Sequence, residues 1–177
     1  KETMTSIRKR LGSKEGKIGI GIARAGLPVT EMLGFPQEEQ RVFDTKRLYD
    51  IGNPNRLYVG IRINDRERLE NINGKDIVVG DGAGATLSSL MAKTLVLTSL
   101  GIRPRSETWA FFALTQQGAS LGSKFLKTLE IKARLLAGLH CKEMTGEPHP
   151  YYLKKGKLMM VHDVGDILDI LTIGPYR

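Results

Sequence analysis

One segment constrains the fold more than any other, the stretch from Asp76 to Lys93, which reads DIVVGDGAGATLSSLMAK. Its short apolar start predicts a buried strand, and the strand ends in Asp81 followed by small, glycine-rich residues up to Thr86. The segment LSSLMAKTLVLTSLG then predicts a helix, with Leu87, Leu90, Met91 and Leu95 at roughly helical spacing and Gly101 at a C-cap position. A strand that turns through glycines into a helix is the repeating unit of a parallel α/β sheet.

The rest of the chain repeats this alternation. The sequence KETMTSIRKRLG predicts a short helix, KIGIGI a buried strand, and Pro28 the start of the next helix. A polar segment from 34 to 55 predicts loops with an exposed ribbon. Further strands are predicted at RLYVGIRI, TWAFFAL and ARLLAGLHC, and a helix at SLGSKFLKTLEI. With 177 residues, we expect one α/β domain with a mainly parallel sheet and helices on both faces.

The glycine-rich turn has the properties of a phosphate site. Gly82 and Gly84 allow close backbone approach to an anion, and the first N–H groups of the following helix point toward it. Thr86 adds a hydroxyl donor or caps the helix, and Asp81 is placed to accept hydrogen bonds from ribose hydroxyls. Two alternatives remain: a tight turn without a ligand, and the loose dinucleotide pattern of Gly80, Gly82 and Ala85.

A second candidate lies in GIGIARAG, where Ile18, Ile20 and Ile22 alternate with glycines. This alternation predicts a buried strand with another part of the backbone close behind it. The strand is expected to end in a loop that carries Arg24 between small residues, a shape that suits a diphosphate. The alternative is that Arg24 is an ordinary surface charge.

Composition limits the partners. The formal net charge of +8 favours anionic ligands, and because no long basic tail occurs, a phosphate ligand is favoured over a nucleic-acid groove. The single cysteine, Cys141, excludes a disulfide framework and fits a reducing cytoplasm. No apolar run approaches the roughly 20 residues of a membrane span, and we expect neither a signal peptide nor a membrane partner. His140, His149 and His162 are too scattered for a metal-ligand spacing.

Five segments in this order resemble the type I phosphoribosyltransferases, and among them the uracil phosphoribosyltransferases. The segments are GIARAGLPVTEML, RLYVGIRINDRERLENINGKDIVVGD, GDGAGATLSSL, TWAFFALTQQG and LKKGKLMMVHDVGDILDI. The resemblance covers about residues 17–172. It departs at two points: the glycine-rich loop is shorter than is usual in the family, and Ile167 follows Asp166 where the family places arginine.

The resemblance implies a reaction in which phosphoribose passes from phosphoribosyl pyrophosphate to uracil or a related pyrimidine, with Mg²⁺ as the cofactor. It implies that Asp81 and Arg62 take part in catalysis, and that a small hood is contributed by about residues 140–177. It also implies a homo-oligomer. The implied substrate-binding residues are Arg24, Ala25, Gly26, Gly82, Ala83, Gly84, Ala85, Thr86, Met160, Val161, His162, Asp163 and Asp166.

In this interpretation Arg24 and Arg62 hold pyrophosphate, and the stretch from Met160 to Asp166 recognises uracil. A different class of function stays open, a non-catalytic module of the same fold that senses a nucleotide or binds RNA. A dinucleotide-binding enzyme is the third alternative.

Overall fold

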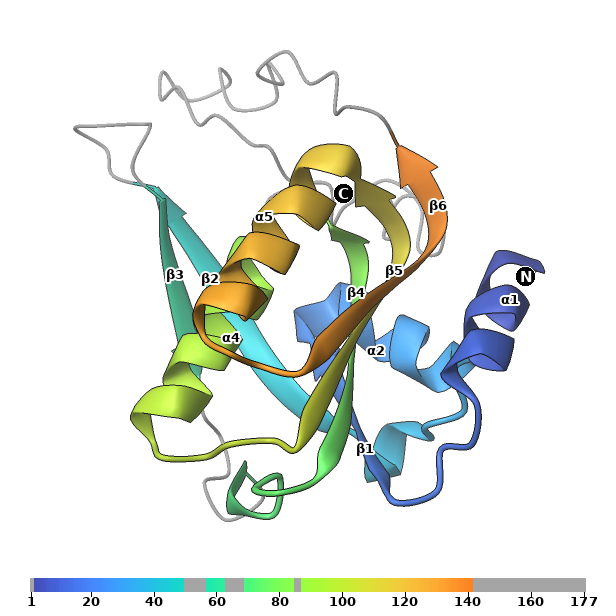
Figure 1. Cartoon of the computed structure of the whole chain (residues 1–177), viewed down its shortest axis with the longest axis horizontal. Coiled ribbons are helices and arrows are strands. Elements are labelled where there is room, and N and C mark those ends of the chain that lie inside the picture. Colours follow the sequence, from blue (N-terminus) through green and yellow to red (C-terminus); the bar gives the residue numbers. More distant parts are fainter. Residues whose placement is uncertain (1, 50–56, 63–68, 85–86, 142–177) are drawn as a thin grey trace, which may run out of the picture.

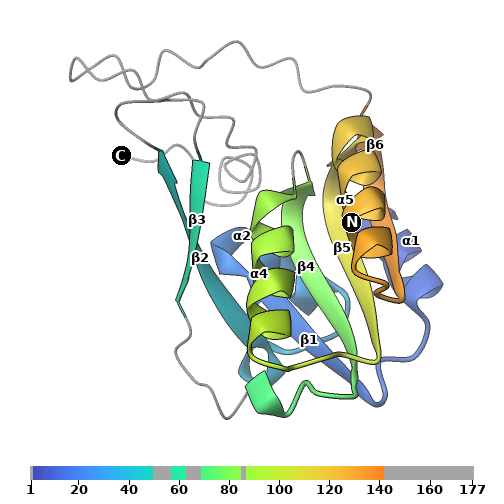
Figure 2. The same cartoon turned by 60° about the vertical axis from the view of Figure 1, so that its left-hand side comes forward.

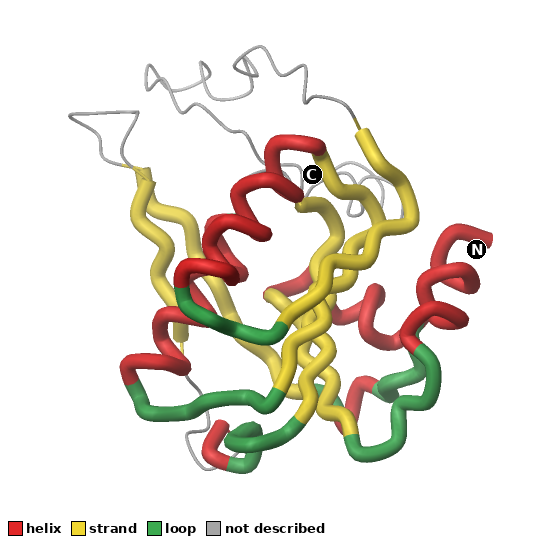
Figure 3. The backbone as a smooth tube through the Cα atoms, viewed as in Figure 1, coloured by secondary structure: helices red, strands yellow, loops and turns green. Residues whose placement is uncertain are grey.

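The computed structural model describes residues 2–49, 57–62, 69–84 and 87–141. They form a six-stranded sheet in the order β3-β2-β1-β4-β5-β6 (Figure 1, Figure 3). All neighbouring strands are parallel except β2 and β3, which pair antiparallel. The strands are β1 (Lys17–Ile22), β2 (Arg41–Tyr49), β3 (Leu57–Arg62), β4 (Asp76–Gly84), β5 (Ser106–Thr115) and β6 (Ala133–Cys141). The expected mainly parallel α/β sheet is therefore confirmed.

Helices cover both faces of this sheet (Figure 2). On one face lie α1 (Glu2–Leu11) and α2 (Ala23–Met32), and on the other lie α4 (Ser88–Ser99) and α5 (Gln116–Thr128). Alternate residues of β4 separate the two cores: Val78 packs with α1 and α2, whereas Ile77 and Val79 pack beneath α4 and α5. A short 3₁₀ turn, Gln37–Glu39, precedes β2. Within the described residues, no helix has both the length and the apolar content that crossing a membrane requires.

The glycines of β1 let α2 and the residues that follow it lie directly on the sheet. A Cβ atom on Gly19 would come within 2.6 Å of the Phe35 ring, and one on Gly21 within 2.8 Å of Leu27 Cδ2. The isoleucines between these glycines point to the opposite face, where Ile20 and Ile22 are buried beneath α4 and α5. The alternation of isoleucine and glycine therefore indicated a close approach correctly.

The start of α2 differs from the sequence prediction. Pro28 was expected to begin the helix, but the helix begins at Ala23, immediately after β1, and Pro28 lies inside it. There is consequently no loop at Arg24, which lies in the first turn of α2. Proline in a helix interior removes one backbone hydrogen bond. The close packing of α2 on β1 and β4 compensates for that loss.

The glycine-rich segment also differs. The strand was expected to end near Asp81, but β4 continues to Gly84 because β5 runs alongside and offers partners as far as Leu114. The segment 34–55 was expected to form loops with an exposed ribbon, but residues 41–49 form strand β2, which pairs with β1 as far as Phe43 and then continues with β3 as the antiparallel ribbon. The predicted buried strand TWAFFAL is confirmed as part of β5, where Trp109 and Phe111 are completely buried.

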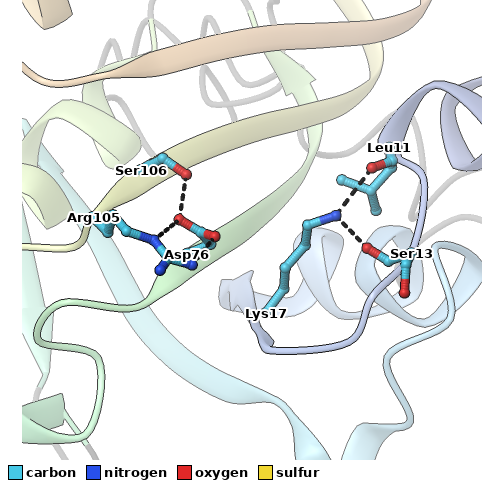
Figure 4. A network of polar contacts seen from close by, with 6 residues as sticks. All are labelled: Leu11, Ser13, Lys17, Asp76, Arg105 and Ser106. Atoms are coloured by element: carbon cyan, nitrogen blue, oxygen red, sulfur yellow. Dashed lines mark hydrogen bonds and ion pairs between the residues drawn. The ribbon is translucent and has the colours of Figure 1, made fainter.

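The amino ends of the strands are held by polar contacts (Figure 4). The carboxylate of Asp76 at the start of β4 accepts hydrogen bonds from Arg105 Nε at 2.9 Å and from Ser106 Oγ at 2.7 Å. The hydrogen bond from Arg105 is the main reason, followed by that from Ser106, why the pKa of Asp76 lies well below its usual range. Lys17 Nζ donates to the Leu11 carbonyl at 3.1 Å, near the end of α1, where the helix dipole favours a cation.

Candidate functional site at the carboxyl edge of the sheet

The carboxyl ends of β1, β4 and β5 lie at the same edge of the sheet because these strands are parallel. At this edge β1 leads into α2, β4 leads toward α4, and β5 leads into α5 (Figure 1). The strand order reverses here: the chain passes from β1 to β2 on one side and later returns to β4 on the other. Open α/β sheets bind ligands at such a switch point, outside the carboxyl ends of the strands.

Two glycines join the two predicted site segments. A Cβ atom on Gly26 of α2 would overlap the carbonyl oxygen of Gly80 in β4, and one on Gly80 would lie 2.7 Å from Thr30 Cγ2. Thr30 Oγ1 in turn donates to the Gly26 carbonyl at 2.9 Å. The first turn of α2, with Arg24 and Ala25, therefore lies beside the β4 residues that lead into Asp81.

Asp81 is the acidic residue at this junction. Its side chain is nearly buried, and its Oδ1 accepts a hydrogen bond from the backbone N–H of Gly82 at 2.8 Å. In the sheet Asp81 is paired with Phe111 of β5, and the next two pairs join Ala83 and Gly84 to that strand. The predicted ribose-binding carboxylate thus has a fixed position on a rigid strand.

The start of α4 lies at the end of β4. Leu87 is its N-cap residue and has a left-handed backbone with φ +58°. Ser, Thr, Asp or Asn at an N-cap usually accepts a hydrogen bond from the first helical N–H groups. A leucine side chain has no atom that can accept this bond. These N–H groups and the helix dipole make the start of α4 suited to an anion.

The two glycines of the predicted phosphate segment have different surroundings. A Cβ atom on Gly84 would come within 2.6 Å of Leu114 Cδ1 and 2.9 Å of Phe111 Cε1. The absence of a side chain at Gly84 is therefore required by the core, whether or not a ligand binds there. Gly82 donates its backbone N–H group to Asp81 Oδ1.

Arg62, the second predicted catalytic residue, lies on the ribbon. It is paired with Asp44 next to Phe43, and Phe43 is paired with Ile22, so Arg62 is almost level with the carboxyl end of β1. Two strand spacings separate it from β1, roughly 10 Å. Its side chain is 74% exposed, and Nε lies 3.8 Å from Asp44 Oδ2. An exposed arginine at this position is able to turn toward a ligand at the switch point.

Several predicted residues fall outside the described part of the chain. They are Ala85, Thr86, Met160, Val161, His162, Asp163 and Asp166, together with the predicted hood beyond Cys141. For Arg24 the structure gives the backbone position, and its side chain is likewise outside the description. Within the described residues, no three His, Cys, Asp or Glu side chains lie close enough together to hold a metal ion.

A buried polar cluster between α4 and the first half of β5 was not predicted from the sequence. Lys93 of α4 is completely buried, and its Nζ lies 2.6 Å from Glu107 Oε2 in β5. Trp109 Nε1 donates to the same oxygen at 2.5 Å, and Glu107 Oε1 has no hydrogen-bond partner among the described residues. Burial lowers the pKa of Lys93, and the carboxylate of Glu107 opposes that change. No pattern in the sequence indicated this burial, because lysine and glutamate are rarely buried.

Comparison with solved structures agrees with this architecture. A protein from Aquifex aeolicus matches 88% of this chain at 17% identity with a TM-score of 0.53, and this chain spans 66% of that protein, just under two thirds. A purine phosphoribosyltransferase from Pyrococcus horikoshii matches 80% of this chain and 82% of its own at 15% identity, with a TM-score of 0.52.

A third solved structure, a Neisseria gonorrhoeae protein with bound ppGpp, matches 98% of this chain and 92% of its own at 13% identity, with a TM-score of 0.55. No protein-family model matches the sequence, and no curated protein matches it significantly. At these identities the comparisons establish the fold: the chain has the α/β fold found in the purine phosphoribosyltransferase.

Proposed function

We propose that this protein is a phosphoribosyltransferase that transfers phosphoribose from phosphoribosyl pyrophosphate to a nucleobase. The contact of Gly26 with Gly80 carries the proposal, because it brings the start of α2 beside the strand that bears Asp81 at the switch point. The fold shared with the Pyrococcus phosphoribosyltransferase supports it. In the reaction the bond between ribose C1 and pyrophosphate breaks, a bond from C1 to a ring nitrogen of the base forms, and the base loses a proton.

Each part of the site has a role in this proposal. The start of α4 binds the 5-phosphate through its backbone N–H groups, and Gly82, Ala83 and Gly84 lead the chain to it. Asp81 accepts hydrogen bonds from the ribose hydroxyls and fixes the sugar. Ala85 and Thr86 complete the phosphate site. Positioning of this kind contributes much of the rate of a group transfer, since the reacting atoms are held at bonding distance and in line.

The start of α2 holds the leaving group. Ala25 and Gly26 offer backbone contacts to pyrophosphate, and Arg24 and Arg62 supply positive charge where negative charge develops as the C1 bond breaks. Arg62 lies on the ribbon and closes on the pyrophosphate from the side of β2.

Mg²⁺ fits the residues present as a substrate-bound ion. It prefers oxygen ligands, keeps several waters, and binds proteins through one or two carboxylates together with substrate phosphates. The Asp81 carboxylate meets the protein's share of that requirement, and the diphosphate supplies further oxygens. When bound, the ion neutralises charge on the departing pyrophosphate.

We further propose that the base is uracil or a related pyrimidine, recognised by residues Met160, Val161, His162, Asp163 and Asp166. The support is the resemblance of this segment to the uracil-recognising segment of the family. This part of the proposal also includes the hood formed by about residues 140–177, a single domain, and homo-oligomerisation.

Calorimetric titration with phosphoribosyl pyrophosphate and Mg²⁺, followed by an assay of pyrophosphate release with each free base, tests these proposals. Binding and release with uracil alone support both the reaction and the base. Release with adenine, guanine or hypoxanthine and not with uracil supports the reaction and overturns the pyrimidine assignment. An absence of binding overturns the proposed function.

A second candidate is a nucleotide-sensing module of the same fold without turnover. The observation that favours it is the Neisseria protein, whose structure holds ppGpp and which matches almost the whole of this chain. Tight binding of ppGpp without pyrophosphate release from any base would identify this function. An RNA-binding form would instead show affinity for RNA that falls steeply with salt.

A further inference from the structure

We propose that Leu87 is a positioning residue that holds the first turn of α4 in place for the 5-phosphate. The Leu87 side chain is wedged between a glycine at the end of β4 and a glycine of α5. This inference rests on the proposed function, since it assigns Leu87 a part in the phosphate site. It concerns the geometry of the site, because Leu87 itself offers the ligand no polar side chain.

The backbone conformation of Leu87 indicates that the surrounding structure holds this residue in place. Its φ of +58° places it in the left-handed region, which leucine adopts at a cost because Cβ approaches the following carbonyl oxygen. Such a conformation persists where the surrounding structure over-determines it. The side chain is 3% exposed, so the surroundings that enforce the conformation are the core.

Two glycines make the space for this side chain. A Cβ atom on Gly84, at the end of β4, would lie 2.7 Å from Leu87 Cδ2. A Cβ atom on Gly122, within α5, would overlap Leu87 Cδ1 and lie 3.2 Å from Leu135 Cδ2. Glycine weakens the interior of a helix, and the space that Leu87 occupies explains why α5 has one at this position.

The position of Leu87 determines where α4 begins. Its carbonyl oxygen accepts the N–H of Met91 at 2.9 Å, so the first turn of the helix is bonded directly to it. The apolar pattern of α4 specifies its rotation only weakly: Ser89, Lys93 and Thr94 are buried, whereas Leu95 is 51% exposed. Leu87 at the first turn and Lys93 in the middle therefore fix the helix on the sheet.

Three variants separate positioning from stability. Leu87→Gly permits the same backbone angle and removes the wedge, and Leu87→Met keeps an apolar side chain of similar volume. Leu97→Ala is the matched control, since Leu97 lies on the same helix, is 1% exposed and is remote from the helix start. Each variant is studied below its unfolding temperature, measured by circular dichroism.

We expect Leu87→Gly to weaken binding of phosphoribosyl pyrophosphate with Mg²⁺ about tenfold or more, because displacement of a binding group by about 1 Å is costly. Leu87→Met and Leu97→Ala should stay within about threefold of the wild type, a difference below 1 kcal/mol. Gly122→Ala, which pushes on Leu87 from α5, should weaken binding as Leu87→Gly does. Unchanged affinity in Leu87→Gly, or an equal loss in Leu97→Ala, overturns the inference.

Hydrogen exchange at the Met91 amide gives a readout that does not need the ligand. It should be faster in Leu87→Gly than in the wild type or in Leu97→Ala, because the bond from Met91 to Leu87 is weakened. If the wild type fails to bind phosphoribosyl pyrophosphate, the proposed function fails, while faster exchange still supports the role of Leu87 in holding α4. Equal exchange in Leu87→Gly and Leu97→Ala overturns that role.

Discussion

At the scale of single residues, glycines determine where the side chains at the carboxyl edge of the sheet lie. Gly26 and Gly80 allow α2 to touch β4, and this contact puts the first turn of α2 beside Asp81. Asp81 is held by the Gly82 N–H and by its place in the strand. A site built on strands and helix starts is more rigid than one built on loops.

Asp81→Asn is the direct test of the ribose contact. Asparagine has nearly the same shape and can still accept the Gly82 N–H, but it loses the charge that we propose binds the sugar hydroxyls and Mg²⁺. We expect kcat/KM to fall about 100-fold, which corresponds to about 2.7 kcal/mol of transition-state stabilisation. The melting temperature should change little, and Glu38→Gln in the exposed 3₁₀ turn is the control. Unchanged turnover in Asp81→Asn would exclude the ribose role.

Gly26→Ala tests the contact between α2 and β4. In an open helix this change would stabilise the protein by up to about 1 kcal/mol, whereas overpacking costs about 1–3 kcal/mol. Because the new Cβ would overlap the Gly80 carbonyl, we expect destabilisation together with weaker pyrophosphate binding, measured by urea unfolding and by calorimetry. Gly74→Ala, at a residue with φ +70° and open space around it, measures backbone strain without a clash. A stabilised Gly26→Ala protein would contradict the packing described.

At the scale of elements, α4 is fixed on the sheet by specific contacts more than by a continuous apolar stripe. Its buried face contains Lys93, which is paired with Glu107 of β5. A buried ion pair adds little net stability, yet removal of one partner leaves an uncompensated charge. The pair therefore selects one rotation of α4 over others, because only that rotation brings the two charges together.

Removal of the charges of Lys93 and Glu107, singly and together, tests this role. Lys93→Met should cost about 3–5 kcal/mol, since it leaves the Glu107 carboxylate buried without its cation. The double variant Lys93→Met with Glu107→Gln should recover much of that loss, because glutamine is neutral and still accepts the Trp109 N–H. Chemical denaturation of the two single variants and the double variant measures the coupling. Additive losses would show that the two side chains act independently.

At the scale of the whole molecule, the two edges of the sheet have different tasks. The carboxyl edge carries the proposed chemistry, while the amino edge carries contacts that hold the elements together. Arg134 Nη2 donates to the Leu11 carbonyl at 3.3 Å, and Lys17 donates to the same oxygen. Both cations lie at the C-terminal end of α1, where a positive charge interacts favourably with the helix dipole.

The stability of the molecule should depend on pH through Asp76. Its pKa is lower in the folded protein than its ordinary value of 3.8, so the unfolded chain binds the proton more readily. The contribution is therefore present above pH 3.8 and is lost as the pH falls through the folded pKa. We expect Asp76→Asn to lose stability less steeply than the wild type in acid, measured by urea unfolding below pH 4. Parallel acid profiles would contradict this role.

Much of the fold was predictable because it depends on local patterns. Strands and helices alternate with a clear change of apolar period, which indicates a parallel sheet covered on both faces. The isoleucine and glycine alternation of β1 indicated the close approach of α2, and Gly101 was correctly placed beyond the end of α4, where it has φ +74°. Of the candidate site, the place of Asp81 on a strand of the parallel sheet followed from the same local reasoning, but β4 continues beyond it to Gly84.

Other features depended on contacts between segments distant in sequence. Helix α2 begins at Ala23 and tolerates Pro28 because β1 and β4 support it. Strand β4 extends to Gly84 because β5 offers hydrogen bonds. Leu95 was predicted on the apolar face of α4 but is exposed, while Lys93 is buried because Glu107 lies opposite. By itself the sequence determined which elements form and in what order. The tertiary structure decided where they begin and which side chains they bury, because those choices depend on partners that only folding brings together.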